Sequence, residues 1–284
     1  MSRVDARRFR CLGFVWSVRT NDAALVDSVT SLYEACVDDG SGPAGNVVGL
    51  RRHEDASVSV DRNGTGGIER APEGVALAQV VWEVNRGVVE EAGDRLLLHA
   101  AAAERDGRIV VLAGPQGSGK STLVTALVCA GFRYVTDEAV AIGPGGAVEP
   151  YPKPISLRGD SLAALSDFCP GLPRAAEPAS EELVAAQNIR RDAIAPPGGT
   201  ADVLVLLSTF QPGRSTAVRP IPRAEAAVAL GEQSFNLRVF GPGGLSLVAE
   251  MVRKCHCYRL DVADLGATRK RLSGLVDDDA SRDR

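Results

Sequence analysis

The chain lacks several features that would narrow its partners or its location at once. Its 284 residues contain no internal repeat, and the arginine-containing N-terminus has no apolar stretch long enough for a signal peptide or a membrane span. We therefore expect a cytoplasmic protein without a membrane partner. The net charge of −4 gives no general reason to expect a nucleic acid or an anionic membrane surface as partner.

A metal-binding pattern of cysteines is also lacking. The six cysteines are scattered, and Cys255-His256-Cys257 has no second ligand pair at the spacing of a zinc site. That tripeptide lies in an alternating run that predicts a strand. Cys129 falls in an apolar segment that predicts a helix, where we expect a free thiol that packs as a small hydrophobic group. Disulfides are not implied.

Lysine is scarce, with four lysines against 28 arginines. One of them, Lys120, completes the stretch 114–121, which fits the phosphate-binding loop pattern G-x-x-x-x-G-K-[ST]. Glycines let successive backbone N–H groups face an anion, and the positive end of the following helix points to the same place. Lys120 would neutralise phosphate oxygens, and the hydroxyl of Ser121 would coordinate magnesium. The residues expected to bind nucleotide are Gly114, Gln116, Gly117, Ser118, Gly119, Lys120, Ser121 and Thr122.

The flanks of this loop have the order that phosphate binding requires. Residues 108–113 predict a buried strand that runs into the loop, and residues 121–130 predict a helix that Gly131 ends. The alternative is a glycine-rich turn that contains Gly-Lys-Ser by chance. The complete and correctly flanked match favours a phosphate-binding loop.

Hydrophobic periodicity and turn residues divide the chain into two parts and a tail. Residues 1–93 predict an α+β module with a strand over 10–18, a helix that Asn21 or Asp22 caps, a hairpin turning at Asn63-Gly64, and a helix over 75–92. This module has no catalytic signature and would serve packing, dimerisation or substrate recognition. Residues 94–276 predict a second domain, which carries the phosphate-binding loop, and residues 277–284 predict a frayed tail.

Residues 94–276 contain segments of both strand and helix periodicity. These segments predict a hairpin over 95–111, later strands over 134–135, 139–142, 203–208 and 258–262, and helices over 223–230 and 244–252. The segment from about 170 to 200 predicts a loop-rich region with one short helix over 180–188.

Two acidic residues follow the strand after the loop helix. Asp137 and Glu138 could supply a base for an attacking hydroxyl and a magnesium ligand, and the alternative is a solvated acidic turn. A metal carboxylate at the end of another apolar strand is not apparent, because Asp202 stands at the start of strand 203–207. His99 precedes the loop on the hairpin and could reach the phosphates, or it could be a hydrogen-bonded histidine of a half-buried strand. Arginines that could neutralise phosphate charge, or simply lie on the surface, are Arg158, Arg190, Arg191 and Arg238.

Together, His99, the loop 114–121, the pair Asp137-Glu138 and Arg158-Gly159 resemble the catalytic domain of the HPr kinase/phosphorylase family. The resemblance covers roughly residues 94–160, with a vaguer similarity near the C-terminus. It implies an α/β fold: a P-loop kinase core of the HPr kinase C-terminal domain/PEP carboxykinase type with a mixed sheet, beside a smaller α+β N-terminal region.

The resemblance also implies roles for individual residues. Asp137 would be the general base, Glu138 and Ser121 would hold magnesium, and Lys120 would grip the β- and γ-phosphates. His99 would lie near the γ-phosphate, and Arg158 would be a further catalytic residue. The sequence departs from the family at Ala100, where the family has glycine, and in residues 1–93. It looks more like small relatives that phosphorylate lasso-peptide precursors on a serine.

We therefore predict a Mg²⁺- and ATP-dependent kinase whose acceptor is a hydroxyl, most simply a serine of a peptide or protein. Two alternatives remain open: a kinase for free serine or another small alcohol, and a nucleotide-binding switch without phosphate transfer. Nucleic acid is not expected as a partner, and homo-oligomerisation is left open.

Overall fold

The computed structural model describes residues 4–174, 177 and 180–282. The chain forms two compact units. The first contains Met1–Gly93 together with two short later segments, Pro152–Pro154 and Glu182–Ala185, and the second contains Asp94–Tyr151, Ile155–Glu181 and Ala186–Arg284. The sequence did not predict that the first unit includes these two later segments.

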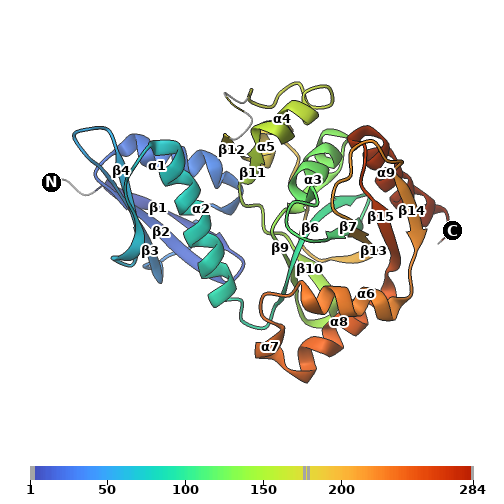
Figure 1. Ribbon diagram of the computed structural model, residues 1–284. Helices are drawn as coiled ribbons and strands as arrows, with labels where there is room; N and C mark the ends of the chain where they lie inside the picture. Colours follow the sequence, from blue (N-terminus) through green and yellow to red (C-terminus); the bar gives the residue numbers. More distant parts are fainter. Residues whose placement is uncertain (1–3, 175–176, 178–179, 283–284) are drawn as a thin grey trace. The chain divides into compact units, whose positions relative to one another are not determined.

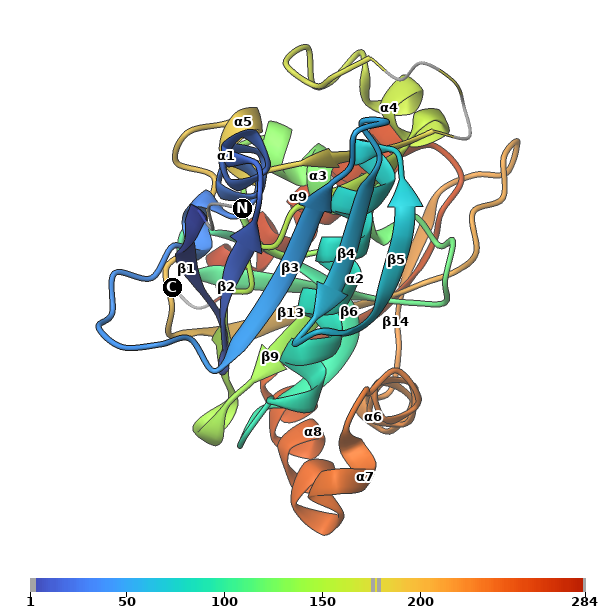
Figure 2. The same cartoon turned by 90° about the vertical axis from the view of Figure 1, so that its left-hand side faces the viewer.

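The first unit is a five-stranded sheet in the order β1-β2-β3-β4-β5 (Figure 2). Its strands are β1 (Val4–Cys11), β2 (Phe14–Thr20), β3 (Asn46–Arg52), β4 (Val58–Arg62) and β5 (Thr65–Ala71), and its helices are α1 (Ala23–Leu32), α2 (Glu73–Glu90) and the short 3₁₀ helix η1 (Glu34–Cys36). The single strand predicted over 10–18 is wrong, because the chain turns at Leu12, whose φ is 53°, and makes a hairpin of β1 and β2.

Buried and partly exposed residues alternate along β2, and the buried ones form the core of this sheet. Every second residue of β2 is buried, from Phe14 to Thr20. Trp16 stacks on Phe9 at 4.5 Å and meets the edge of Tyr33 at 5.2 Å between ring centroids. Asp22 caps α1 by accepting a hydrogen bond from the backbone N–H of Ala24, as the sequence predicted.

The second unit is built on an eight-stranded mixed sheet. Its strands are β6 (Leu96–Arg105), β7 (Arg108–Ala113), β8 (Arg133–Thr136), β9 (Ala139–Ile142), β10 (Ala147–Glu149), β13 (Gly199–Leu207), β14 (Ala217–Pro220) and β15 (His256–Asp261). Strands β7, β13 and β15 are parallel, whereas β6 runs antiparallel to β7 and pairs with both β8 and β9. The mixed α/β architecture is confirmed.

Helices cover both faces of this sheet (Figure 1). Helices α3 (Lys120–Cys129) and α9 (Leu265–Arg282) lie on one face, and α6 (Arg223–Glu232) and α8 (Pro242–Lys254) lie on the other. The hydrophobic core on the second face joins β6, β7 and β13 to α6 and α8. The remaining elements are β11 (Ile155–Arg158), β12 (Glu181–Val184), α4 (Gly159–Leu165), α5 (Ala186–Ile189), α7 (Leu237–Phe240) and η2 (Pro144–Gly146). Within the described residues, no helix combines the length and apolarity that a membrane crossing would need.

Two predictions of local structure are wrong. The helix predicted over 180–188 is replaced by β12 and the short α5, because four consecutive residues of this segment pair as a strand. The tail predicted to fray after Val276 instead continues α9 to Arg282. Tertiary contacts stabilise this last stretch, because the guanidinium of Arg105 donates to the carbonyl of Ser273 and to the carboxylate of Asp277. Residues 283–284 of the predicted tail lie outside the described residues.

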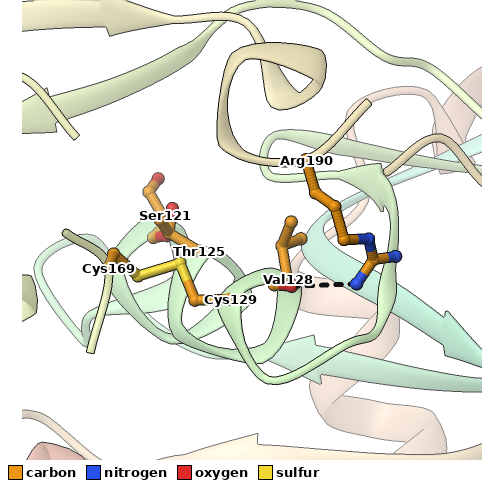
Figure 3. Close-up of a disulfide and its surroundings, with 6 residues drawn as sticks. All are labelled: Ser121, Thr125, Val128, Cys129, Cys169 and Arg190. Atoms are coloured by element: carbon orange, nitrogen blue, oxygen red, sulfur yellow. Dashed lines mark hydrogen bonds between the residues drawn. A yellow bond between two sulfur atoms is a disulfide. The ribbon is translucent and has the colours of Figure 1, made fainter. Parts of the chain in front are cut away.

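The prediction for Cys129 is also wrong. Cys129, at the end of α3, forms a disulfide with Cys169, which follows α4 (Figure 3). The two residues are 40 positions apart, so no local pattern joins them. The other four cysteines, Cys11, Cys36, Cys255 and Cys257, are buried thiols outside this disulfide. Disulfides are uncommon in the reducing cytosol, so this bond gives no support to the predicted cytoplasmic location.

Candidate functional site

The candidate site lies where several strands of the second unit end. Strands β7, β13 and β15 are parallel, and β8 shares their direction because both β7 and β8 run antiparallel to β6. Their carboxyl ends therefore meet at one edge of the sheet, the edge at which open α/β sheets bind ligands. The predicted phosphate-binding loop leaves β7 at this edge and enters α3.

The loop has the backbone that its glycines predict. Gly117 and Gly119 have φ angles of +78° and +89°, which residues other than glycine rarely adopt. At Gly114 a Cβ atom would lie 2.9 Å from the hydroxyl of Ser118 and 3.0 Å from Leu207, so the loop is closely packed there. Helix α3 follows with no side-chain cap at its N-terminus. Its first N–H groups and its positive dipole end therefore suit an anion.

Lys120 is a buried cation whose ammonium is held by the loop itself. It is 7% exposed, and its ammonium donates to the carbonyls of Gly114 at 2.9 Å and Pro115 at 3.2 Å. Among the described residues, no carboxylate lies within ion-pair distance of it. Burial lowers the pKa of Lys120, and the negative charges of Glu138 and Asp137 partly offset this effect. A buried ammonium held by loop carbonyls is an electrostatic site for an anionic ligand.

Asp137 is joined to the loop. Its Oδ2 accepts a hydrogen bond from the hydroxyl of Ser121 at 2.7 Å, and its Oδ1 accepts one from the hydroxyl of Tyr134 at 2.8 Å. Asp137 is 3% exposed, and Tyr134 is fully buried. Burial, and then the charge of Asp137, raise the pKa of Tyr134 well above its usual value, so its hydroxyl stays protonated and donates. The two predicted residues Ser121 and Asp137 therefore lie together.

Glu138 and His99 form a second pair beside the first. The register of the sheet places His99 of β6 opposite Ala139, the residue after Glu138. Nε2 of His99 lies 3.8 Å from Oε1 of Glu138, and both side chains are partly exposed, at 30% and 38%. Desolvation, and then the positive charge of Lys120, lower the pKa of His99. The imidazole is therefore neutral at neutral pH and acts as a hydrogen-bonding group.

A pocket of about 540 Å³ opens beside the loop. The loop residues Gly117–Gly119 form one wall, together with Thr122, whose hydroxyl bonds that of Ser161 at 3.0 Å. The aromatic side chains of Phe168 and Phe210 contribute apolar surface. The remaining lining residues are Leu123, Asp160, Ala164, Asp167, Val262, Ala263, Asp264, Leu265 and Gly266. The hydroxyl oxygen of Ser118 is buried and has no hydrogen-bond partner among the described residues.

The predicted arginines occupy different places. The exposed Arg158 pairs with Asp160, which lines this pocket. Among the described residues, no contact joins Arg158 to Asp137 or Glu138. Arg190 donates to the carbonyl of Val128 at the C-terminal end of α3 (Figure 3) and to the carbonyl of Phe132 just after it, so it lies at the end of the helix opposite the loop. The suggestion that Arg190 neutralises phosphate is therefore wrong. Arg191, Arg238 and Gln116 are exposed.

Tyr134 and the aromatic pair Phe168 and Phe210 were missed by sequence reasoning. An aromatic residue in a strand predicts core packing, and only the fold shows that the hydroxyl of Tyr134 meets a carboxylate. Asp202 bonds the backbone N–H of Ile109 at 2.9 Å, at the start of β7, away from the loop. Nor does any group of three or more potential metal-binding side chains gather within the described ranges.

Comparisons with known proteins give little further information. No protein-family profile and no curated protein sequence matches the chain. Among solved structures, the chain is similar to the Hpr(Ser) kinase/phosphatase from Coxiella burnetii, with 10% sequence identity and a TM-score of 0.28. The match covers 63% of this chain and 97% of that one. Similarity at this level does not establish a shared function, so the interpretation of the site depends on its own geometry.

Proposed function

We propose that the protein is an ATP- and Mg²⁺-dependent kinase that transfers a phosphoryl group to a hydroxyl. One observation carries the proposal: the loop that buries Lys120, with no carboxylate of the described residues at ion-pair distance, also brings Ser121 into contact with Asp137. A loop that only binds an anion needs the lysine and the helix N-terminus. A carboxylate joined to the loop serine adds what phosphoryl transfer requires, a metal ligand beside the phosphates.

The site fits a nucleoside triphosphate. Phosphate oxygens would supply the negative charge that Lys120 lacks, and the free N–H groups at the start of α3 would donate to them. The pocket beside the loop has the volume and the mixed apolar and polar lining of a ligand site. Phe168 and Phe210 offer aromatic faces to a base, and Asp160 and Asp167 offer acceptors to ribose hydroxyls or an exocyclic amine.

The donor set also fits magnesium. This ion prefers oxygen ligands, and in nucleotide sites one or two carboxylates are completed by substrate phosphates and water. Ser121 and Asp137 provide hard oxygen atoms beside the loop, and no group of three or more potential metal-binding His, Cys, Asp or Glu side chains occurs in the described part of the chain. When bound, the ion would neutralise charge that develops on the transferred group.

The surroundings of His99 favour a peptide or protein acceptor over free serine. The ring of Phe235 lies 5.4 Å from the imidazole ring of His99 and is 40% exposed. The segment that holds Phe235 is fixed to β6, because the N–H of Phe235 donates to the carbonyl of Leu97. A serine with an apolar neighbouring side chain could place its hydroxyl near Glu138 and cover this ring.

Isothermal titration calorimetry with MgATP tests the nucleotide part of the proposal. Lys120→Ala removes the buried cation and should weaken MgATP binding by at least tenfold, because a charge-assisted contact is worth about 1.5–3 kcal/mol. The matched control is Lys270→Ala, which removes a lysine of α9 outside the site. Equal affinity of wild type and Lys120→Ala would refute phosphate binding by the loop.

Mass spectrometry tests the transfer. The enzyme is incubated with MgATP and, separately, with free serine or a library of serine-containing peptides. A gain of one phosphate on peptides only supports the proposal, and a gain on free serine only identifies a small-metabolite kinase. Tight MgATP binding without transfer to any acceptor would favour a nucleotide-dependent switch.

A further inference from the structure

Asp137 and Glu138 are adjacent in sequence but lie in different surroundings. They occupy the break between β8 and β9, which pair one after the other with β6. The chain bends at these two residues. Asp137 is 3% exposed and contacts the loop, whereas the side chain of Glu138 is 38% exposed and lies near His99.

Both oxygens of Asp137 already have donors. Ser121 donates to Oδ2 at 2.7 Å and Tyr134 donates to Oδ1 at 2.8 Å, which fixes the plane of the carboxylate. An acceptor substrate arriving from solvent meets no exposed oxygen there. A carboxylate held against the loop serine is instead the arrangement by which P-loop enzymes bind magnesium.

Glu138 has the opposite properties. Its carboxylate is partly exposed and lies 3.8 Å from Nε2 of His99, and the ring of Phe235 lies 5.4 Å from that imidazole ring. The backbone around it is held in place, because its N–H donates to the hydroxyl of Thr136 at 3.3 Å. A hydroxyl that entered beside His99 would therefore reach Glu138 before Asp137.

We propose that Glu138 receives the proton of the acceptor hydroxyl, and that Asp137, with Ser121, holds the magnesium ion. The assignment rests on the proposed kinase function and reverses the roles that the family resemblance implies. In the step, the acceptor oxygen forms a bond to the γ-phosphorus while its proton passes to the carboxylate of Glu138. The bond from the γ-phosphorus to the β–γ bridging oxygen breaks, and its electron pair leaves with ADP.

Two substitutions separate the roles, with calorimetry of ATP binding in Mg²⁺ and in EDTA as a readout independent of turnover. Glu138→Gln should bind MgATP within about threefold of wild type, whereas transfer to the peptide library falls by about 10²–10⁴-fold, the usual contribution of a general base. Asp137→Asn should lose most of the Mg²⁺ dependence of ATP affinity, by roughly 10-fold or more.

Two further variants serve as controls. Because Asp137 is buried, Ser121→Ala provides a second test of magnesium binding that leaves the carboxylate in place. Like Asp137→Asn, it should lower the Mg²⁺ dependence of ATP affinity. The exposed Glu232→Gln should change neither readout. The circular dichroism spectrum of each variant is compared with that of the wild type.

The outcomes distinguish this assignment from the kinase proposal. If Glu138→Gln loses the Mg²⁺ dependence and Asp137→Asn binds MgATP normally but transfers no phosphate, the roles are the reverse of those proposed. If Glu138→Gln transfers phosphate at the wild-type rate, the assignment is also wrong, while the kinase function stands. A wild-type protein that does not bind MgATP would overturn the kinase function and this assignment together.

Discussion

Removal of the disulfide between Cys129 and Cys169 should destabilise the second unit by about 4 kcal/mol. The bond closes a loop with a sequence separation of 40 residues. The chain-entropy estimate for a loop of that length is about 13 cal/mol/K, which is about 4 kcal/mol at 25 °C. The double substitution Cys129→Ala with Cys169→Ala removes the bond without leaving an unpaired thiol.

Urea denaturation, followed by two signals, measures the effect. Far-ultraviolet circular dichroism reports both units, whereas tryptophan fluorescence reports the first, because Trp16 and Trp82 are the two tryptophans of the chain. With an m-value of roughly 2–3 kcal/mol/M, the transition of the second unit should fall by about 1.5 M urea in the double variant. The fluorescence transition should shift less, because both tryptophans lie in the other unit.

A reductant and a thiol count complete the test. Reduced wild type should unfold at about the same urea concentration as the double variant, and the variant itself should not respond to reductant. Thiol titration of unreduced, denatured wild type should find only the four cysteines outside the disulfide. Six reactive thiols, or an unchanged dichroism midpoint in the double variant, would refute the reasoning.

The remaining predictions concern the charge state of the site and the packing of the first unit. In an NMR titration, His99 should titrate below its ordinary value of 6.5, so it is neutral at pH 7 and gains its proton only as the pH falls; Lys120→Met should raise this pKa, because the nearby positive charge is removed. Gly87→Ala should destabilise the first unit by about 1–3 kcal/mol, because the added Cβ would lie 2.4 Å from the ring of Phe14, and fluorescence-detected urea denaturation measures this. The matched control in the same helix, Gly74→Ala, meets no atom within 4 Å and should leave stability unchanged or raise it by up to about 1 kcal/mol.

Local patterns predicted the elements that contiguous residues define. The hairpin of β6 and β7, the cap of α1 by Asp22, and the strand–loop–helix around Lys120 all depend on residues a few positions apart. The helix predicted over 180–188 was wrong, because pairing of β12 with β11 outweighed a weak helical pattern. The prediction of a frayed tail was also wrong, because contacts with Arg105 of β6 hold α9 in place.

The sequence by itself determined that the chain has a loop built for phosphate, because glycine torsions, the lysine and the helix start all lie within eight consecutive residues. Only the tertiary structure decided which partner each side chain meets. It joined Cys129 to Cys169, and it set Asp137 against Ser121 while leaving Glu138 beside His99. The physical reason is that Asp137 and Glu138 lie in the bend between β8 and β9, so their surroundings depend on how these two strands pair with β6 and on the position of α3, which no short stretch of sequence specifies.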